Sequence, residues 1–543
     1  MPRHPLISVI MPCYNTPDPE NFLAIESVVG QLYPHWELCI ADDASTDPRM
    51  RQVLTRYSQQ DSRIKVVFRP QNGHIAAASN SALEVASGEF VALLDHDDLL
   101  SEHALFWMAQ AILDHPHAAL FYSDEDKVDE AGWRSDPYFK CSFNLDLFLS
   151  HNLITHLGVY KTSLLRQLGG FRPGFDGAQD WDLALRFLDH IGQEQIVHIP
   201  RILYHWRMHP ASTARSQQAK PYAYVAAQQA LNDYFKRNRI AASAEFLADI
   251  GAFRPRYALP RPCPLVTLII PTRNGVNQLR PCLESILKKT DYHPYDILLV
   301  DNGSDDPATL AWFAQLSTQP NLHIVRYDAP FNYSAINNFA VNLARGDLLA
   351  LLNDDTEIID KDWLTEMVSI ALQPGVGAVG ARLWYPNDTV QHGGVILGLG
   401  GYAAHAHRLF PKNHPGYAGR LMLMQSYSAV TAACLVVSKS AYQQVGGMDE
   451  KNLVVAYNDV DFCLRLREAG YRNVWTPFAN LYHHESMSRG PENTPEKQVR
   501  FQREKEYLDQ RWGKLLAEDP AYSPNLTQDR EDFSYAWPPR VES

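Results

Sequence analysis

The sequence predicts an α/β protein made of two copies of one domain, each with a mostly parallel central sheet. Three observations support this fold class. The chain of 543 residues is longer than one hydrophobic core usually serves. The segment SVIMPCYN at residues 8–15 returns as TLIIPTRN at residues 267–274. Short apolar runs alternate with helix-like segments in each half, which is typical of right-handed βαβ units.

The repeat fixes the expected domain boundaries. Asp42 in ADDAS precedes Asp301 in VDNGS by 259 residues, and Asn80 precedes Asn338 by 258, so the halves align with one residue of drift. A proline-rich stretch separates them, and the end of the chain is polar. We expect a first domain at 1–245 that ends in a closing helix, a linker at 246–264, a second domain at 265–515 and a loosely packed tail at 516–543.

The composition excludes some classes of function. A formal net charge of −13 gives no electrostatic support for a nucleic-acid partner. The seven cysteines are scattered without a CxxC pair, as expected for buried thiols in a reducing compartment. No stretch reaches the roughly 18 to 20 apolar residues of a membrane span, and the amino terminus has no leader pattern. We therefore expect a cytoplasmic protein whose membrane contact, if it has one, is peripheral.

Strands and helices alternate through the first part of each half. The carboxyl ends of parallel strands share one edge, so the polar segments after the first, second and fourth strands should converge there on a ligand. Asp42 and Asp43, taken alone, could equally form an Asx turn before a helix. The expected strands of the first half are 7–11, 36–41, 64–68 and 90–94, and the expected helices are 19–31, 50–59 and 76–86.

A cluster of carboxylates ends the fourth strand. The apolar run at 90–94 leads directly into Asp95, Asp97 and Asp98. Acids crowded at a strand end can hold a hard divalent ion such as Mg²⁺ or Mn²⁺, which bridges to the phosphates of a nucleotide. A polar turn that closes a strand has the same pattern, and the short motif leaves both interpretations open. The second half repeats the motif as LLALLNDDTEI at 348–358.

A further pair of acids stands at predicted helix starts. Apolar residues at helical spacing between 181 and 188 predict a helix that begins near Asp180, and the second half repeats the start of this pattern at Asp459. An acid at such a position commonly caps its helix. Its occurrence in both halves after a Gly-Gly loop favours a catalytic role instead. Asp182 and Asp461 are interpreted as structural acids.

The motifs SVIMPCYN, ADDAS and Asp-X-Asp, in this order and in both halves, resemble the GT-A nucleotide-sugar glycosyltransferases, specifically the large inverting group called family 2. The resemblance covers nearly the whole chain except the linker and tail. It implies two GT-A domains in tandem, a divalent Mn²⁺ or Mg²⁺ ion and a UDP-, dTDP- or GDP-sugar donor. By this resemblance the base and ribose pocket is lined by Pro12, Tyr14, Asn15, Asp42 and Asp43 in the first half and by Pro271, Arg273, Asn274, Asp301 and Asn302 in the second.

The resemblance also assigns the metal ligands. Asp97 is the principal ligand of the first half, with Asp95 in support. Asp355 takes the metal role in the second half, where Asn353 replaces the first acid. Asp98, whose counterpart is a threonine, is expected to matter least.

Family members commonly add a late histidine to the metal shell, and we choose His209 and His484 for this role. Matching LYHW with LYHH instead pairs His205 with His483, so the choice within each cluster stays open. Each histidine could also serve only packing or hydrogen bonding. The glycine- and histidine-rich segment at 390–410 is interpreted as a flexible loop near the acceptor cleft.

The resemblance places the catalytic base at Asp180 and Asp459. It implies a bifunctional, inverting transferase that extends a bacterial surface polysaccharide such as O-antigen or capsule. The acceptor would be a lipid-linked oligosaccharide at the inner membrane face, where other assembly enzymes could be partners. Two alternatives remain: one active domain beside a degenerate acceptor-binding domain, and a nonenzymatic carbohydrate-binding protein.

Overall fold

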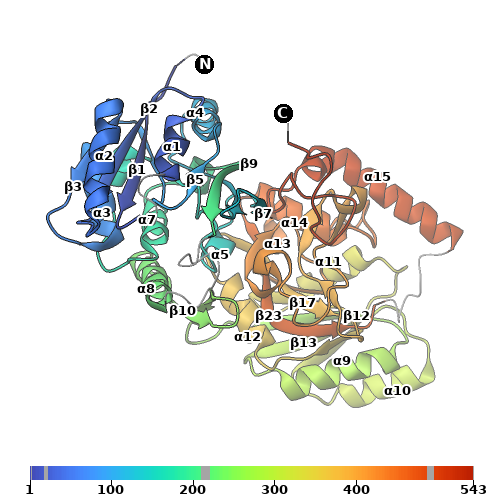
Figure 1. The fold of residues 1–543 in the computed structure, drawn as a ribbon. Helices are drawn as coiled ribbons and strands as arrows, with labels where there is room; N and C mark the ends of the chain where they lie inside the picture. The colour runs from blue at the N-terminus through green and yellow to red at the C-terminus, as the bar shows by residue number, and fades with distance from the viewer. Residues whose placement is uncertain (2, 17–21, 209–220, 486–493, 542–543) are drawn as a thin grey trace. The chain divides into compact units, whose positions relative to one another are not determined.

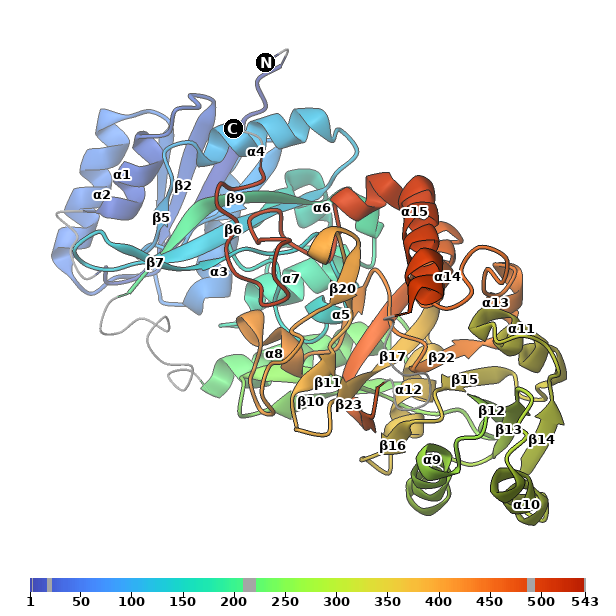
Figure 2. The same cartoon turned by 90° about the vertical axis from the view of Figure 1, so that its right-hand side faces the viewer.

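The computed structural model describes residues 1, 3–16, 22–208, 221–485 and 494–541. The chain divides into two compact units, Met1–Arg256 and Tyr257–Glu542, which correspond to the two sequence repeats (Figure 1, Figure 2). The first unit ends in a hairpin of β10 (Ala242–Leu247) and β11 (Ala252–Tyr257). The segment expected as a linker, 246–264, therefore begins inside this hairpin.

The first unit begins with the expected alternation of strands and helices. The strands β3, β2, β1 and β4 lie in this order and pair in parallel, with every residue of β1 and β2 buried. Apolar side chains on both faces of these strands explain their continuous hydrophobic runs. The elements are β1 (Ile7–Cys13), α1 (Leu23–Val29), β2 (Trp36–Asp42), α2 (Pro48–Gln60), β3 (Ile64–Phe68), α3 (His74–Val85) and β4 (Phe90–Leu93).

The rest of the first sheet is mixed rather than parallel throughout. After β4 the order continues β8, β6, β9 and β5, and β8 runs antiparallel to both of its neighbours. The strands β6 and β9 are parallel. The elements are β5 (Leu99–Leu100), α4 (Ala104–Asp114), β6 (Leu120–Val128), β7 (Arg134–Tyr138), α5 (Leu145–Phe148), β8 (Val159–Lys161), α6 (Thr162–Gln167), α7 (Gln179–Phe187), β9 (Ile196–Arg207) and α8 (Pro221–Arg237).

The second unit repeats this topology strand for strand. Its main sheet has the order β14, β13, β12, β15, β22, β17, β23 and β16. The helices α9 and α10 pack beside one another, as both views show (Figure 1, Figure 2). The elements are β12 (Val266–Thr272), α9 (Val276–Lys289), β13 (Tyr295–Asp301), α10 (Pro307–Leu316), β14 (Leu322–Arg326), α11 (Tyr333–Leu343), β15 (Leu348–Leu352), β16 (Thr356–Ile358), α12 (Trp363–Ala371), β17 (Val376–Trp384), β22 (Cys434–Ser438), α13 (Lys439–Gln444), α14 (Asn458–Glu468), β23 (Arg472–His483) and α15 (Pro495–Ala517).

The segment between β17 and β22 differs from the expectation of a flexible loop. It contains short strands, and β19 pairs with β20 as an antiparallel hairpin. Backbone pairing within and between these strands satisfies the polar groups of a chain that is glycine-rich but largely buried. The strands are β18 (Val390–His392), β19 (Val395–Leu397), β20 (Ala403–His405) and β21 (Gln425–Tyr427).

The tail at 516–543, expected to pack loosely, is well packed where the structure describes it. Leu526 is fully buried and Phe533 is 3% exposed. The Phe533 ring stacks on His407 with 3.9 Å between ring centroids. Asp519 accepts a hydrogen bond of 2.6 Å from the backbone N–H of Leu397. The tail covers the β19–β20 hairpin, and its few apolar side chains are enough to anchor it.

All seven cysteines are free thiols, and all but Cys263 are buried. In the described ranges, none of the helices combines the length and apolar character needed to cross a bilayer.

Candidate active sites

Two asparagines tie the first strand of each unit to the loop after the second strand. Asn15 Oδ1 accepts hydrogen bonds of 2.9 and 3.2 Å from consecutive backbone N–H groups of that loop. Asn274 Oδ1 accepts the equivalent pair, both at 3.0 Å. Both residues have positive φ, 47° and 49°, which asparagine tolerates better than most residues. The side chains of these two predicted pocket residues therefore shape the loop.

The predicted base-pocket acids play different parts in the two units. In the first, Asp43 pairs with an arginine at 2.7 Å, whereas Asp42 Oδ1 is buried with no hydrogen-bond partner among the described residues. In the second, Asp301 pairs with an arginine at 2.6 Å, and Asn302 Oδ1 is the buried oxygen that lacks a partner in the described chain. An unpaired buried acceptor is costly, so each suits a donor group of a ligand.

The first unit gathers three possible metal ligands. Asp95, Asp98 and His156 each offer a donor atom, and these atoms lie within 4.8 Å of one another. Asp98 also accepts hydrogen bonds from Tyr204 Oη at 2.6 Å and from a backbone N–H of β9 at 2.8 Å. This group includes Asp95, which was predicted as a supporting ligand. It does not include Asp97, the predicted principal ligand, but contains Asp98, which was expected to matter least.

A charged wall, formed by Glu125, Lys140 and His156, borders this group. Glu125 Oε2 lies 3.0 Å from His156 Nδ1 and 3.3 Å from Lys140 Nζ. The Lys140 side chain is completely buried. Burial alone would lower the pKa of His156, but the negative charge of Glu125, with Asp98 and Asp95, outweighs burial and raises the pKa to about 9. The wall is therefore an ion-pair network, in which the His156 side chain keeps 22% of its surface exposed.

The predicted bases lie in the first turns of α7 and α14. Asp180 Oδ2 accepts a 2.7 Å hydrogen bond from Asn152 Nδ2, and Asp459 Oδ2 accepts one of 3.1 Å from the backbone N–H of Ala432. Neither is the N-cap of its helix, and each side chain bonds to another segment. Burial raises the pKa of Asp180, and the nearby His156 offsets this only in part.

The acids two residues later are structural, as expected. Asp182 and Asp461 are fully buried and pair with arginines one helical turn farther on, Arg186 and Arg465, at 2.9 and 2.8 Å. These ion pairs fix α7 and α14 within their units.

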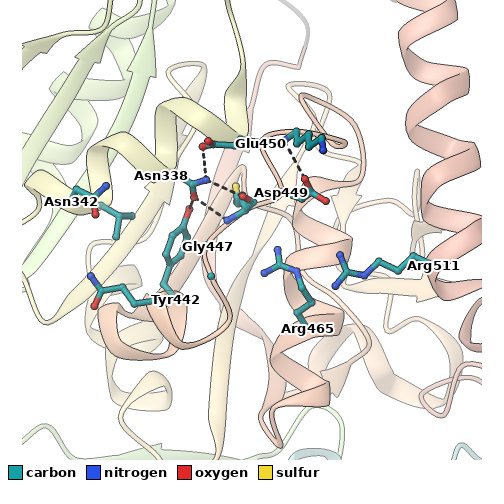
Figure 3. A pocket seen from close by; sticks show the side chains of 13 residues that line it. Asn338, Asn342, Tyr442, Gly447, Asp449, Glu450, Arg465 and Arg511 are labelled. Atoms are coloured by element: carbon teal, nitrogen blue, oxygen red, sulfur yellow. Dashed lines mark hydrogen bonds between the residues drawn. The ribbon is translucent and has the colours of Figure 1, made fainter.

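The Gly-Gly turn before each candidate base is held by an asparagine. The side chain of Asn338 donates a hydrogen bond to the carbonyl oxygen of Met448 and accepts one from the backbone N–H of Met448, each at 2.9 Å. It also accepts a hydrogen bond of 2.7 Å from Tyr442 Oη (Figure 3). The turn lines a surface pocket of about 550 Å³. Asn80 makes the same two backbone bonds to Phe171 in the first unit, both at 2.8 Å.

A cavity of about 420 Å³ in the second unit joins the predicted groups. It extends from Arg273 and Asn302 at the strand ends, past Asp355, to Asp459. Asn274, Asp301 and His484 do not line it. The other lining residues include Pro271, Asn353, Asp354, Gln391, His405, Thr431, Tyr457, His483 and Glu485.

The late histidines separate by strand register. His483 Nε2 lies 3.1 Å from Asp355 Oδ1, and its Nδ1 is 2.7 Å from Gln391 Oε1. His484 instead lies 3.5 Å from Glu357 and lines a different pocket. The geometry thus favours His483 over the predicted His484 beside the metal position. The predicted His209 lies outside the described residues.

The register also corrects the matching of LYHW with LYHH. Leu99, two residues after Asp97, pairs with His205, whereas Glu357, two residues after Asp355, pairs with Tyr482. The structural counterpart of His205 is therefore Tyr482. His205 Nδ1 lies 2.5 Å from an oxygen of Asp126 and does not enter the acid group.

Sequence reasoning missed the charged wall, whereas the segment at 390–410, which contains β18 to β20, was expected near a cleft and contributes Gln391 and His405 to the cavity. The wall had one visible signal, the run Ser-Asp-Glu-Asp-Lys at 123–127 inside an otherwise apolar strand, β6. Charges in a buried strand need partners, and these partners, Lys140 and His156, lie in segments joined to Glu125 only by folding.

Comparisons with known proteins agree with the repeated architecture. The model of Glycosyl transferase family 2 matches residues 8–169 and 267–446. An uncharacterized protein y4gI of Sinorhizobium fredii is 51% identical over 98% of this chain and 59% of its own length. The O-antigen biosynthesis protein RfbC of Myxococcus xanthus is 37% identical over 97% of this chain and 40% of its own length. The chain thus spans about 59% and 40% of these curated relatives.

Among solved structures, TarS residues 1–349 of S. aureus in complex with UDP-GlcNAc is 20% identical, with a TM-score of 0.32, and the match covers 43% of this chain and 72% of that one. Two α/β units with acids at the strand ends, each matched by the same family model, define a tandem GT-A architecture. The chain belongs to glycosyl transferase family 2, as its sequence motifs predicted.

Proposed function

We propose that both units are inverting transferases that move sugars from nucleoside-diphosphate donors to acceptor hydroxyl groups. The observation that carries this proposal is the cavity of about 420 Å³ that connects Arg273 and Asn302 with Asp355 and Asp459. It brings a base-pocket end, a metal-ligand acid and a candidate proton acceptor into one space. Inversion needs these groups to be held in line with the donor sugar.

Asp180 and Asp459 would accept the proton of the attacking hydroxyl. Each projects from a helix start and is held by a hydrogen bond from another segment, Asp180 Oδ2 from Asn152 and Asp459 Oδ2 from Ala432. Asp459 Oδ1 also accepts a bond of 2.9 Å from the next backbone N–H. Burial raises the pKa of Asp180, which makes its carboxylate a stronger base. A second carboxylate for a covalent intermediate is not required.

A divalent cation fits the acids at the strand ends. Asp95, Asp98 and His156 lie within 4.8 Å and offer two carboxylates and one imidazole, whose ring must lose its proton before it can bind the ion. In the second unit Asp355 lies beside His483. This donor set is compatible with Mn²⁺ or Mg²⁺. When bound, such an ion supplies Lewis-acid stabilisation of the departing diphosphate.

The substrate class proposed is a growing bacterial surface polysaccharide. The family match and the O-antigen biosynthesis relative support this role. The acceptor would be a lipid-linked oligosaccharide, which a protein without its own spanning helix in the described ranges would reach peripherally. UDP-, dTDP- and GDP-sugars are the donors to test.

The test is transfer of sugar from a panel of these donors to lipid-linked acceptor with Mn²⁺ or Mg²⁺. Wild type is compared with Asp180→Asn and Asp459→Asn, each with an exposed acid of the same unit as control, Asp136→Asn and Glu284→Gln. Loss of a general base should slow one transfer by about 10²- to 10⁴-fold in each variant, while the controls retain activity.

The outcomes separate the alternatives. If both catalytic variants keep full transfer, the base assignments are wrong. If only one variant is slowed, the chain has one active domain beside an acceptor-binding domain. If the wild type binds nucleotide sugars but transfers nothing to any acceptor in the panel, the nonenzymatic alternative replaces the proposal.

A further inference from the structure

A buried glutamate of the last helix holds the loop in front of Asp459. Glu504 lies in the middle of α15, and only 1% of its surface is exposed. Its Oε1 accepts a 2.9 Å hydrogen bond from the backbone N–H of Val455, and its Oε2 accepts one of 3.1 Å from that of Ala456. Two charge-assisted bonds to consecutive amides form a rigid clamp.

The clamped amides belong to the last turn before the candidate base. Tyr457, the next residue, is the N-cap of α14 and has a φ of 56°, a conformation that is unfavourable for a tyrosine. Asp459 follows in the first turn. Tyr457 and Asp459 both line the cavity. The surrounding structure must impose the Tyr457 conformation, and Glu504 bonds the backbone immediately before it.

Other residues of α15 anchor the helix to the same segment. Tyr507 Oη donates to Asp449 Oδ2 at 2.8 Å, and Trp512 Nε1 donates to Asp461 Oδ1 at 2.9 Å. Figure 3 shows Asp449 on the loop that follows the Gly-Gly turn, with Arg511 of α15 among the lining residues. Helix α15 therefore contacts the segment that leads to Asp459 at three places: at Asp449, immediately before Tyr457, and in the first turn of α14.

The first unit holds its corresponding loop differently. Ala178 occupies the N-cap position before Asp180, with a φ of −142°, so no left-handed residue is needed there. The preceding Gly177 donates its backbone N–H to Gln179 Oε1 at 2.7 Å, a bond within the loop itself. The clamp from α15 is thus particular to the second unit.

We propose that Glu504 is a positioning residue that fixes the loop carrying Asp459 and so sets the rate of sugar transfer by the second unit. The inference rests on the proposed role of Asp459 as base. Glu504 does not line the cavity, so it acts through the backbone of the loop and not on substrate. A carboxylate is required because both of its oxygens face N–H donors. A glutamine would aim one N–H group at another.

The test compares the full-length wild type with Glu504→Gln and with Glu506→Gln, an exposed glutamate of the same helix, as the matched control. Hydrogen exchange measured by mass spectrometry needs no substrate. We expect the peptide that contains Val455 and Ala456 to exchange faster in Glu504→Gln only, while peptides of the first unit and of β12 to β15 keep their rates. Unchanged exchange in the peptide of the loop would overturn the proposal.

Kinetics then distinguish positioning from general destabilisation. With the donor and acceptor identified for the second unit, Glu504→Gln should lower kcat by about tenfold or more, because small misplacement of a catalytic group is costly. The KM for donor and the stoichiometry of nucleotide binding should stay as in wild type, since Arg273 and Asn302 lie on other elements. A kcat equal to that of Glu506→Gln contradicts the inference.

The two failures can be told apart by including Asp459→Asn. If this variant transfers sugar normally, the proposed function of the second site fails, and the positioning role falls with it. If it is inactive and Glu504→Gln is fully active, only the positioning inference fails.

Discussion

The two candidate sites share a backbone frame but have different walls. Each unit contains the same antiparallel pair in its main sheet, β8 with β6 or β22 with β17, with Val159 opposite Phe121 and Val436 opposite Val379. From this register, His156 corresponds to Ala433. The first site therefore faces a buried imidazole where the second has a methyl group.

The second unit fills its wall from another source. Gln391 and His405 reach the cavity from the β18–β20 segment, and burial lowers the pKa of His405 to about 4, so this wall is neutral. The first wall consists of the ion pairs among Glu125, Lys140 and His156. The comparison teaches that duplication preserved the strand ends and the aspartates at the helix starts, whereas segments between strands changed the surroundings of the candidate sites.

The largest effect should come from breaking the charged wall. Lys140→Met leaves Glu125 buried without its ammonium partner, which should destabilise the first unit by about 3 to 5 kcal/mol. The measurement is chemical denaturation followed by hydrogen exchange in each unit. The second unit should keep its stability, because the residue that corresponds to Glu125 on its equivalent strand, β17, is apolar and needs no charged partner.

Lys127→Met is the matched control, since Lys127 is partly exposed and pairs with an exposed acid, Asp136. Adding Glu125→Gln to Lys140→Met should restore part of the loss. Equal stability of Lys140→Met and Lys127→Met would show that the wall contributes nothing.

The next effect concerns the metal. His156→Ala should weaken binding of Mn²⁺ to the first unit by about 10- to 100-fold, the scale found when a supporting group of a metal site is removed. Calorimetric titration of the full chain should show two classes of site, of which only one changes. His205→Ala is the control, because His205 lies against Asp126 outside the acid group. A change in both classes or in neither contradicts the assignment.

Much of the fold and the frame of the site could be predicted from the sequence. Residues with local signals were located correctly on their elements: the four parallel strands, and Asp180 and Asp459 at helix starts. Strand runs, helix periodicity and turn residues are properties of short segments, so they are readable without the fold. The duplication doubled each signal.

The remaining features depend on register and on distant partners. The sequence could not separate His483 from His484, because one residue of shift exchanges the two faces of a strand and composition does not record it. Lys140 meets Glu125 through the pairing of β6 with β7, and His156 meets it through the pairing of β6 with β8. The tail appeared polar, and its packing depends on a few apolar anchors such as Phe533.

A smaller effect concerns the pH dependence of the first unit's stability. Burial alone would raise the pKa of Glu37, but hydrogen bonds from Lys65, Ser8 and Ser87 outweigh it and lower the pKa to about 2. The ionised form therefore stabilises the fold fully above the ordinary value of 4.5, and this contribution is lost as pH falls toward 2.

Glu37→Gln should accordingly destabilise the first unit by about 1.5 kcal/mol at neutral pH. The difference from wild type should shrink as the pH is lowered from about 4.5, when stability is measured by urea denaturation at several pH values. Glu89→Gln, at an exposed ion pair, is the control. A difference that grows on acidification would reverse the sign of this argument.

The smallest effect separates the base pockets. Among the residues that the structure describes, the buried oxygen without a hydrogen-bond partner belongs to Asp42 in the first unit and to Asn302 in the second. Asp42→Ala and Asn302→Ala should each remove one ligand hydrogen bond, about 1 kcal/mol or roughly fivefold in nucleotide affinity, in their own unit only.

The two acceptors differ, since Asp42 has a carboxylate and Asn302 has an amide, and they lie one position apart in the repeat. The two units should therefore also rank UDP, dTDP and GDP differently. Competition titrations on Asp180→Asn and Asp459→Asn backgrounds, which leave both pockets in place, measure this ranking. If both units rank the nucleotides in the same way and either alanine variant loses the same affinity, then the side-chain oxygens of Asp42 and Asn302 do not determine which base is bound.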